Sequence, residues 1–209
     1  MKVGVLGTGE VGKALAGGML LLGHAVMLAG RSADNQAAAA WAKDAGPLAS
    51  HGSFADAARY GELFFLATQG TVAEAALTMA GPGNFAGKVL IDVSNAIEGS
   101  PLTLAIVGAD SIGERVQRLL PEANVVKAFN TANHQLFVHP KLSARPDMFI
   151  AGNDDGAKAE VGKICEAWGW GVVDLGGIES ARYCEAIAMA WIINAFRNNA
   201  WSVAFKLVS

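Results

Sequence analysis

Three glycines near the start of the chain form the pattern that points most directly to chemistry. Gly7, Gly9 and Gly12 follow the apolar run at 2–6 and precede an amphipathic helical pattern. In a strand–turn–helix unit, the first glycine allows a tight turn, the second lets the backbone approach a pyrophosphate, and the third lets the helix pack closely. The helix N-terminus offers free amide groups and a positive dipole end. The spacing therefore predicts a dinucleotide-binding site.

The residues after the second predicted strand, 25–29, indicate which dinucleotide binds. Proteins that prefer NAD usually have Asp or Glu here to hold the ribose 2′-hydroxyl. This chain has Arg31 and Ser32 instead, with no carboxylate before Asp34. A guanidinium and a hydroxyl suit a 2′-phosphate, so the pair favours NADP(H). The alternative is that Arg31 is a surface side chain and that Ser32 only caps the next helix.

Polar residues also follow two further predicted strands, 62–67 and 88–93. Thr68 and Gln69 end the first of these strands, and Asn95 follows the second. Open α/β sheets bind ligands at the carboxyl ends of their strands. We therefore expect Thr68 and Gln69 to contact the ribose or phosphate, and Asn95 to contact the nicotinamide ribose or amide. Ordinary turn formation and strand termination are the alternative roles.

The most polar strand end follows the predicted strand 124–129. It reads Asn130-Thr131-Ala132-Asn133-His134. His134 is a candidate proton donor, and the alternative is a hydrogen-bonded loop histidine. Neither a Ser/His/Asp triad, a metal cluster nor a cysteine nucleophile is evident, so the sequence predicts no catalytic side chain and no metal ligand. This pattern is typical of direct hydride transfer, in which the cofactor carries the chemistry.

Strand and helix patterns alternate along the chain and predict an α/β fold. We expect an NAD(P)-binding Rossmann fold with a doubly wound, mostly parallel sheet and a short C-terminal helical extension. The predicted domain boundaries are 1–178 for the NADP-binding domain and 179–209 for the extension, which packs on that domain or on a dimer partner. Trp201 and Phe205 are expected to extend this helix. Only some thirty residues follow the last strand, so the second substrate should bind on the nucleotide domain itself.

Composition narrows the class of protein and its partners. Hydrophobic residues make up 52% of the 209 residues and charged residues 17%, as expected for a sheet covered on both faces. The net charge of −3 and the lack of a basic block argue against nucleic acid. The uncharged stretch 14–30 is interrupted by glycines and is predicted to be a helix and a strand, not a membrane span. A strand at the start leaves no room for a signal peptide, and Cys165 and Cys184 are expected to be buried, reduced thiols of a cytoplasmic protein.

Several motifs together resemble the NADP-dependent coenzyme F420 oxidoreductases, over nearly the whole chain. They are the glycine loop at 7–12, Gly-Arg-Ser at 30–32, Val-Val-Lys-Ala-Phe-Asn-Thr at 125–131 and the glycine-rich segment 174–182. Members of this family pass a hydride between NADP(H) and a deazaflavin. Where well-studied members have His, this chain has Asn130.

The resemblance implies a cofactor site and an acceptor pocket that share one domain. The cofactor-binding residues would be Gly7, Thr8, Gly9, Glu10, Val11, Gly12, Arg31, Ser32, Thr68, Gln69, Asn95, Ala96 and Asn130. The acceptor pocket would be formed by Thr131, His134, Gly177 and Ile178, with Asn130 at its border. The expected cofactor is NADP(H), with coenzyme F420 or a flavin as co-substrate. Two alternatives stay open: reduction of a small carbonyl or imine polarised by His134 or Asn130, and a redox sensor that binds NADP(H) without turnover.

Overall fold

One eight-stranded sheet organises the protein, in a computed structural model that describes residues 1–208. The strand order is β10-β9-β8-β5-β4-β1-β2-β3. The strands of this sheet are β1 (Lys2–Leu6), β2 (Ala25–Gly30), β3 (Ala49–Ser53), β4 (Leu63–Leu66), β5 (Val89–Asp92), β8 (Asn124–Lys127), β9 (Asp147–Gly152) and β10 (Gly171–Asp174). A small hairpin is formed by β6 (Ile97–Glu98) and β7 (Thr103–Leu104).

Seven α-helices within the described residues connect or follow these strands. They are α1 (Glu10–Leu21), α2 (Gln36–Ala45), α3 (Phe54–Tyr60), α4 (Ala73–Ala80), α5 (Ile112–Leu119), α6 (Asp155–Ala167) and α7 (Ala181–Asn198). Short 3-10 turns lie at Gly70–Val72, Pro82–Phe85, His134–Leu136 and Ile178–Ser180. The order of strands and helices is that of a Rossmann-type α/β fold, as the sequence predicts.

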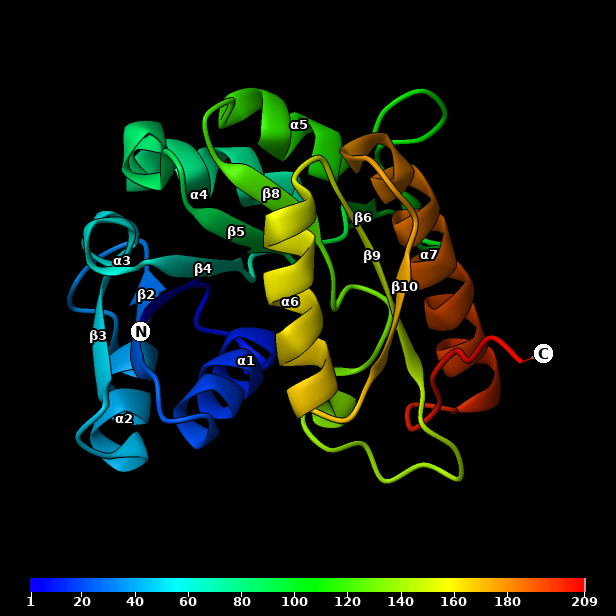
Figure 1. Ribbon diagram of the computed structural model, residues 1–209, viewed down its shortest axis with the longest axis horizontal. Coiled ribbons are helices and arrows are strands. Elements are labelled where there is room, and N and C mark those ends of the chain that lie inside the picture. The colour runs from blue at the N-terminus through cyan, green and yellow to red at the C-terminus, as the bar shows by residue number, and fades with distance from the viewer. Residues whose placement is uncertain (209) are drawn as a thin grey trace.

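Helices cover both faces of the sheet and create two large apolar layers (Figure 1). On one face, α1, α2 and α6 pack on side chains such as Val5, Leu28 and Ile150. On the other face, α3, α4 and α5 pack on side chains such as Leu66 and Leu90. The sheet is therefore the middle of three layers, and its strand ends remain free to form a site.

Local capping signals explain why several helices begin where they do. Ser53 caps α3 in a capping box, because its hydroxyl accepts from the Asp56 amide while the Asp56 carboxylate accepts from the Ser53 amide. Asp154 caps α6 by accepting from the amide of Ala157. Ser and Asp are among the residues favoured at helix N-caps. Within residues 1–208, no helix is long and apolar enough to span a bilayer.

The last two strands differ in direction from the other six, within the mostly parallel sheet that the sequence predicts. The six strands from β3 to β8 in the sheet are parallel, but β9 runs antiparallel to β8, and β10 runs parallel to β9. The chain from 128 to 146 contains one 3-10 turn and no α-helix that could carry it back across the sheet. Because a parallel return needs such a crossover, β9 enters from the other end.

The C-terminal segment differs from the predicted helix. The helix α7 ends at Asn198, and Asn199 adopts a left-handed conformation with φ of +49° that stops it. Trp201 and Phe205 therefore lie outside the helix. The tail returns to the sheet, where the amide of Asp147 donates to the carbonyl of Phe205 at 2.9 Å. Figure 1 shows α7 beside β9 and β10, at the end of the sheet opposite β3.

Candidate functional site

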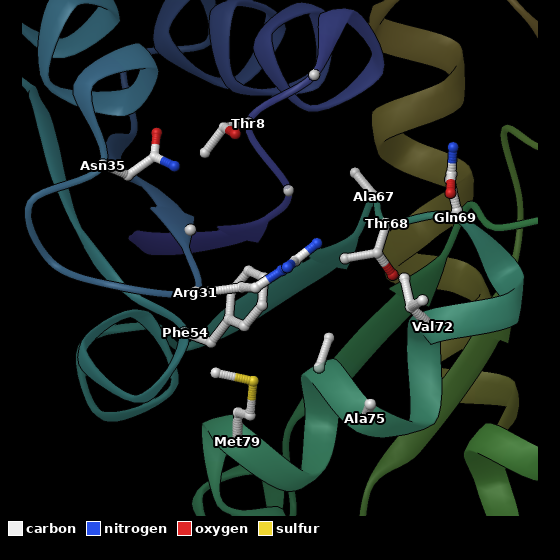
Figure 2. Close-up of a pocket in the computed structure, with 14 residues that line it drawn as sticks. Thr8, Arg31, Asn35, Phe54, Ala67, Thr68, Gln69, Val72, Ala75 and Met79 are labelled. Carbon is white, nitrogen blue, oxygen red and sulfur yellow. The ribbon is translucent and has the colours of Figure 1, made fainter.

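A cavity of about 820 Å³ lies at the carboxyl ends of β1, β2 and β4 (Figure 2). This is the edge of the sheet at which open α/β folds bind ligands. Its volume is in the range of small-molecule and cofactor sites. The residues that line it are Gly7, Thr8, Gly9, Gly30, Arg31, Asn35, Phe54, Ala67, Thr68, Gln69, Val72, Ala75, Ala76 and Met79.

The glycine loop has the geometry that its spacing predicts. Gly7 has a φ of +135°, and a Cβ atom there would collide with the carbonyl of Ala67 on the neighbouring strand end. At Gly12, a Cβ atom would collide with the carbonyl of Gly7, so α1 lies directly against the loop. A Cβ atom at Gly9 would meet nothing within 4 Å. Two glycines thus allow close packing, while Gly9 leaves open space on the cavity wall.

The first turn of α1 offers unpaired backbone donors to that space. Gly9 is the N-cap residue and supplies no capping side chain. Thr8 lines the cavity, whereas Val11 is half-buried and packs against the core. Glu10 is exposed and pairs with Lys13 at 3.0 Å, which lowers the pKa of the Glu10 carboxyl. A negative group at the loop would therefore bind at the positive end of the helix dipole. The negative charge of Glu10 nearby is paired with Lys13.

Arg31 supplies the positive charge of the cavity. Its side chain extends from the end of β2 toward Thr68 (Figure 2). Among the described residues, no carboxylate lies within ion-pairing distance of its guanidinium. Ser32 does not line the cavity, and its hydroxyl lowers the pKa of the exposed Asp34 by hydrogen bonding. The guanidinium is therefore free to receive an anion.

Asn35 is a polar residue of the cavity that sequence reasoning missed. Its Oδ1 accepts from the Ala38 amide at 3.0 Å, so Asn35, not Ser32, caps α2. The side-chain amide lies against Gly30, where an added Cβ would approach Nδ2 to 2.8 Å. The amide group is thus held against Gly30, and the idea that Ser32 is the helix cap is wrong. An Asn a few residues after a predicted strand end was the available signal.

An apolar wall completes the cavity and was also missed. It consists of Phe54 at the start of α3 together with Val72, Ala75, Ala76 and Met79 on and before α4. Val72 and Met79 are large apolar side chains that are 43% and 50% exposed. Exposed apolar side chains that line a cavity can bury a planar ring, so this wall suits the nucleobase of a dinucleotide. Sequence reasoning misses this wall because apolar side chains on a helix are also typical of core residues.

Thr68 and Gln69 lie on the cavity, as expected from the end of β4. The hydroxyl oxygen of Thr68 is buried and has no hydrogen-bond partner within residues 1–208. A buried polar atom without a partner is uncommon in folded proteins, and a bound ligand is one way to satisfy it. This orphaned hydroxyl, the open space at Gly9 and the unpaired Arg31 together fit a dinucleotide phosphate and its ribose.

Asn95 and Asn130 are brought together although 35 residues separate them. Asn95 Nδ2 donates to the carbonyl of Asn130 at 2.9 Å, and Asn130 Nδ2 donates to Asn95 Oδ1 at 3.0 Å. The amide of Gly70 donates to the carbonyl of Asn95 at 3.1 Å, which joins this pair to the turn after Gln69. Ala96 is buried against Gly70. Asn95, Ala96 and Asn130 are not among the described residues that line the cavity. The turn from Gln69 to Gly70 connects the cavity to the Asn95–Asn130 pair.

The four residues expected in an acceptor pocket are not all close together. Thr131 is buried and its hydroxyl lies 3.9 Å from the sulfur of Met148. His134 begins a 3-10 turn packed against α1. The amide of Ile178, next to Gly177, instead donates to Asn153 just beyond the end of β9.

The turn after β10 lies beside Val125 and Val126 in the middle of β8, because Gly152 pairs with Val126 and its amide donates to the carbonyl of Gly176. Asn130 follows the carboxyl end of β8. Gly177 and Ile178 are therefore not brought to the strand ends that carry the other predicted residues. The reason is the reversed direction of β9 and β10, which local sequence patterns do not encode.

The fold and the cavity define a Rossmann-type dinucleotide-binding domain. Residues 2–96 match the family described as NADP oxidoreductase, coenzyme F420-dependent. A solved structure from Arthrobacter sp. FB24, described as that of a candidate F420-dependent NADP reductase, is 39% identical to this chain. It superposes with a TM-score of 0.93, and each chain is covered over 100% of its length. The chain belongs to this family of NADP-dependent oxidoreductases.

Two curated relatives are similar over part of their own length. The metalloreductase STEAP3 of Rattus norvegicus is 29% identical over 189 residues, which cover 90% of this chain and 36% of that protein. The F420-dependent NADP reductase of Methanocaldococcus jannaschii is 30% identical over 106 residues, which cover 48% of each protein. The chain therefore spans less than half the length of the curated relatives it matches.

Proposed function

We propose that this protein transfers a hydride between NADP(H) and a deazaflavin such as coenzyme F420, or a flavin-like ring. The observation that carries the proposal is the cavity itself. A glycine loop with open space at Gly9 faces a guanidinium, that of Arg31, which has no ion-pair partner among the described residues. Such an arrangement suits a pyrophosphate and a 2′-phosphate on one molecule.

The residues of the chain would bind and orient the cofactor. The loop amides at 8–12 would hold the pyrophosphate, and Arg31 with Ser32 and Asn35 would hold the 2′-phosphate. Thr68, Gln69, Asn95 and Asn130 would border the ribose and the nicotinamide. Bound NADPH supplies the hydride from its reduced nicotinamide ring. No side chain is assigned as an acid or base.

The choice of acceptor is supported by the named relatives. The relative from Arthrobacter is described as a candidate F420-dependent NADP reductase, and the one from Methanocaldococcus as an F420-dependent NADP reductase. One relative is a metalloreductase, so ferric chelates are also tested as acceptors, either reduced directly or through a flavin. Thr131 and His134 would border the acceptor, next to the Asn95–Asn130 pair.

Steady-state oxidation of NADPH with a panel of acceptors tests the proposal. The panel contains F420, riboflavin, FMN, FAD, ferric chelates and a small cyclic imine. We expect turnover with F420 or a flavin, and no turnover with the imine. Turnover with the imine alone would replace the proposal by imine reduction. Micromolar NADPH binding without turnover on any acceptor would replace it by a redox sensor.

We also propose that the protein works in the cytoplasm as a homodimer. Both cysteines are buried free thiols, as is common in proteins of a reducing compartment. The C-terminal strip, defined as Ile193, Phe196 and Trp201, is exposed apolar surface at the end of α7. A self-complementary contact through this strip would bury it.

A further inference from the structure

The carbonyl oxygen of the Asn130 side chain is buried and has no hydrogen-bond partner among the described residues. The residue is only 6% exposed. Building on the proposed function, we propose that Asn130 Oδ1 accepts an amide-type N–H of the bound rings, namely the carboxamide of the nicotinamide. Asn130 would then be a specificity-determining residue for the reacting end of the cofactor.

The orientation of the Asn130 amide is fixed by its other contacts. Nδ2 donates to Asn95 Oδ1 at 3.0 Å and to the carbonyl of Cys184 at 3.0 Å. Turning the amide over would place Oδ1 against these two oxygen atoms, which cannot donate. The orphaned atom is therefore the acceptor, and only a hydrogen-bond donor can satisfy it.

The backbone before Asn130 is strained. Phe129 has a φ of +58°, which a bulky side chain rarely adopts. The ring is buried and is held by Phe65, Phe137 and Trp168, at centroid distances of 6.3, 5.6 and 5.1 Å. Strained conformations persist where the surroundings impose them, and they cluster at ligand sites. Here the strain turns the chain so that Asn130 meets Asn95.

The Cys184 carbonyl is itself fixed by a buried ionic cluster. Its neighbour Glu185 accepts from the amides of Ile112 and Gly113 at 3.2 and 3.1 Å, at the start of α5. Glu185 also pairs with Lys127 at 3.0 Å, and Lys127 pairs with Asp92 at 2.9 Å. These side chains are at most 1% exposed. The helix α7 is thereby anchored to β5 and β8, and it presents Cys184 to Asn130.

Asn130 continues a line of polar strand ends that begins in the cavity. Thr68, Asn95 and Asn130 follow β4, β5 and β8, which are neighbours in the sheet. Neighbouring strands are about 4.8 Å apart, so Asn130 lies roughly two strand spacings from Thr68. Thr68 Oγ1 is the other orphaned oxygen on this line. A cofactor that passes Thr68 would carry its far ring toward Asn130.

Binding of cofactor analogues to the full-length protein tests the inference. In 3-acetylpyridine-NADP⁺ the carboxamide NH₂ is replaced by a methyl group, whereas thionicotinamide-NADP⁺ keeps its N–H donors. We expect the acetyl analogue to bind wild type about tenfold more weakly than NADP⁺, and the thio analogue to bind within about twofold. In Asn130→Ala the difference should vanish. The matched control Asn133→Ala, on the same loop, should keep it.

A second measurement distinguishes the other source of an N–H donor, the ring imide of the acceptor. Turnover of riboflavin is compared with that of N3-methylriboflavin. A preference for riboflavin that Asn130→Ala abolishes, with no effect of the acetyl group on cofactor binding, would overturn the assignment to the nicotinamide and place the N–H donor on the acceptor ring. The inference is overturned if wild type binds the acetyl and thio analogues equally well and also reduces riboflavin and N3-methylriboflavin equally well. This result needs only wild type, so it holds even if Asn130→Ala does not fold. Failure of NADP⁺ itself to bind contradicts the proposed function instead.

Discussion

Arg31 is the residue on which the choice between the two nicotinamide dinucleotides depends. Its guanidinium extends across the cavity without an ion-pair partner among residues 1–208. We expect Arg31→Glu to weaken NADPH binding by about 100-fold and NADH binding by about threefold or less, because only NADPH carries the 2′-phosphate. Fluorescence titration with both dinucleotides measures this ratio. Equal losses for the two would contradict the assignment.

Gly9 offers a second test at the same scale. A methyl group there meets no protein atom within 4 Å, so Gly9→Ala should fold normally yet occupy the space of the pyrophosphate. We expect NADPH binding to weaken at least about tenfold. Gly17→Ala is the matched control, since Gly17 on α1 also has open space around an added Cβ. The control should bind NADPH normally, and normal binding by Gly9→Ala would refute the loop's role.

Residue types and spacing reveal part of the site. The glycine loop, Arg31, Thr68 and Gln69 lie on one cavity because each follows a parallel strand at the same sheet edge. Phe54 and the apolar residues of α4 escape notice, since an apolar side chain on a helix looks like core until its exposure is known. The pairing of Asn95 with Asn130 depends on tertiary contacts, including the strained turn at Phe129.

At the scale of elements, the strands from β1 to β8 in the main sheet are predicted to within a few residues and the mostly parallel sheet is confirmed, but the reversed direction of β9 and β10 is not predicted. This reversal keeps the segment 176–178 away from the carboxyl end of β8. A signal for it exists, because 128–146 lacks the helical period that a parallel crossover requires. The predicted helical tail fails for a related reason. Apolar residues in that tail pack on β9 as an extended segment and need no helix.

An ion pair between α5 and α7 makes the free energy of unfolding depend on pH. Glu114 on α5 binds Arg182 on α7 through two contacts of 2.5 and 2.8 Å, and this pairing lowers the pKa of the Glu114 carboxyl. The stabilising contribution is therefore present above the unfolded pKa of about 4.3 and is lost as the pH falls through the lower folded value. Arg182 is about a third exposed, so the contribution is of order 1 kcal/mol.

Urea unfolding of wild type and Glu114→Gln at pH 7 and pH 3 measures this contribution. We expect the variant to be less stable than wild type at pH 7 by about 1 kcal/mol, and the gap to shrink toward pH 3. Glu160→Gln, on α6 and outside this pairing, should show no such gap. A gap that is independent of pH would contradict an ionic contact between α5 and α7.

For the whole molecule, the proposed homodimer predicts that the C-terminal strip joins two subunits. Ile193 and Phe196 are 48% and 62% exposed, and Phe196 contacts Trp201 edge to face at 5.0 Å. We expect sedimentation to show a concentration-dependent dimer that Phe196→Lys converts to a monomer, because a charge there would be buried without a partner. Lys206→Glu, on the tail, serves as a control for charge. A wild-type monomer at all concentrations would contradict the dimer.

Anaerobic mixing of F420 or a flavin with NADPH that carries deuterium at both hydrogen positions of C4 tests the central claim most directly. Direct transfer predicts that one acceptor is reduced for each NADPH oxidised, and that the label appears on the acceptor carbon in the F420 reaction. It also predicts that Gly9→Ala and Arg31→Glu slow the reaction while Gly17→Ala does not. Tight binding of NADPH without reduction of either acceptor, or reduction of F420 without the label, would contradict the account.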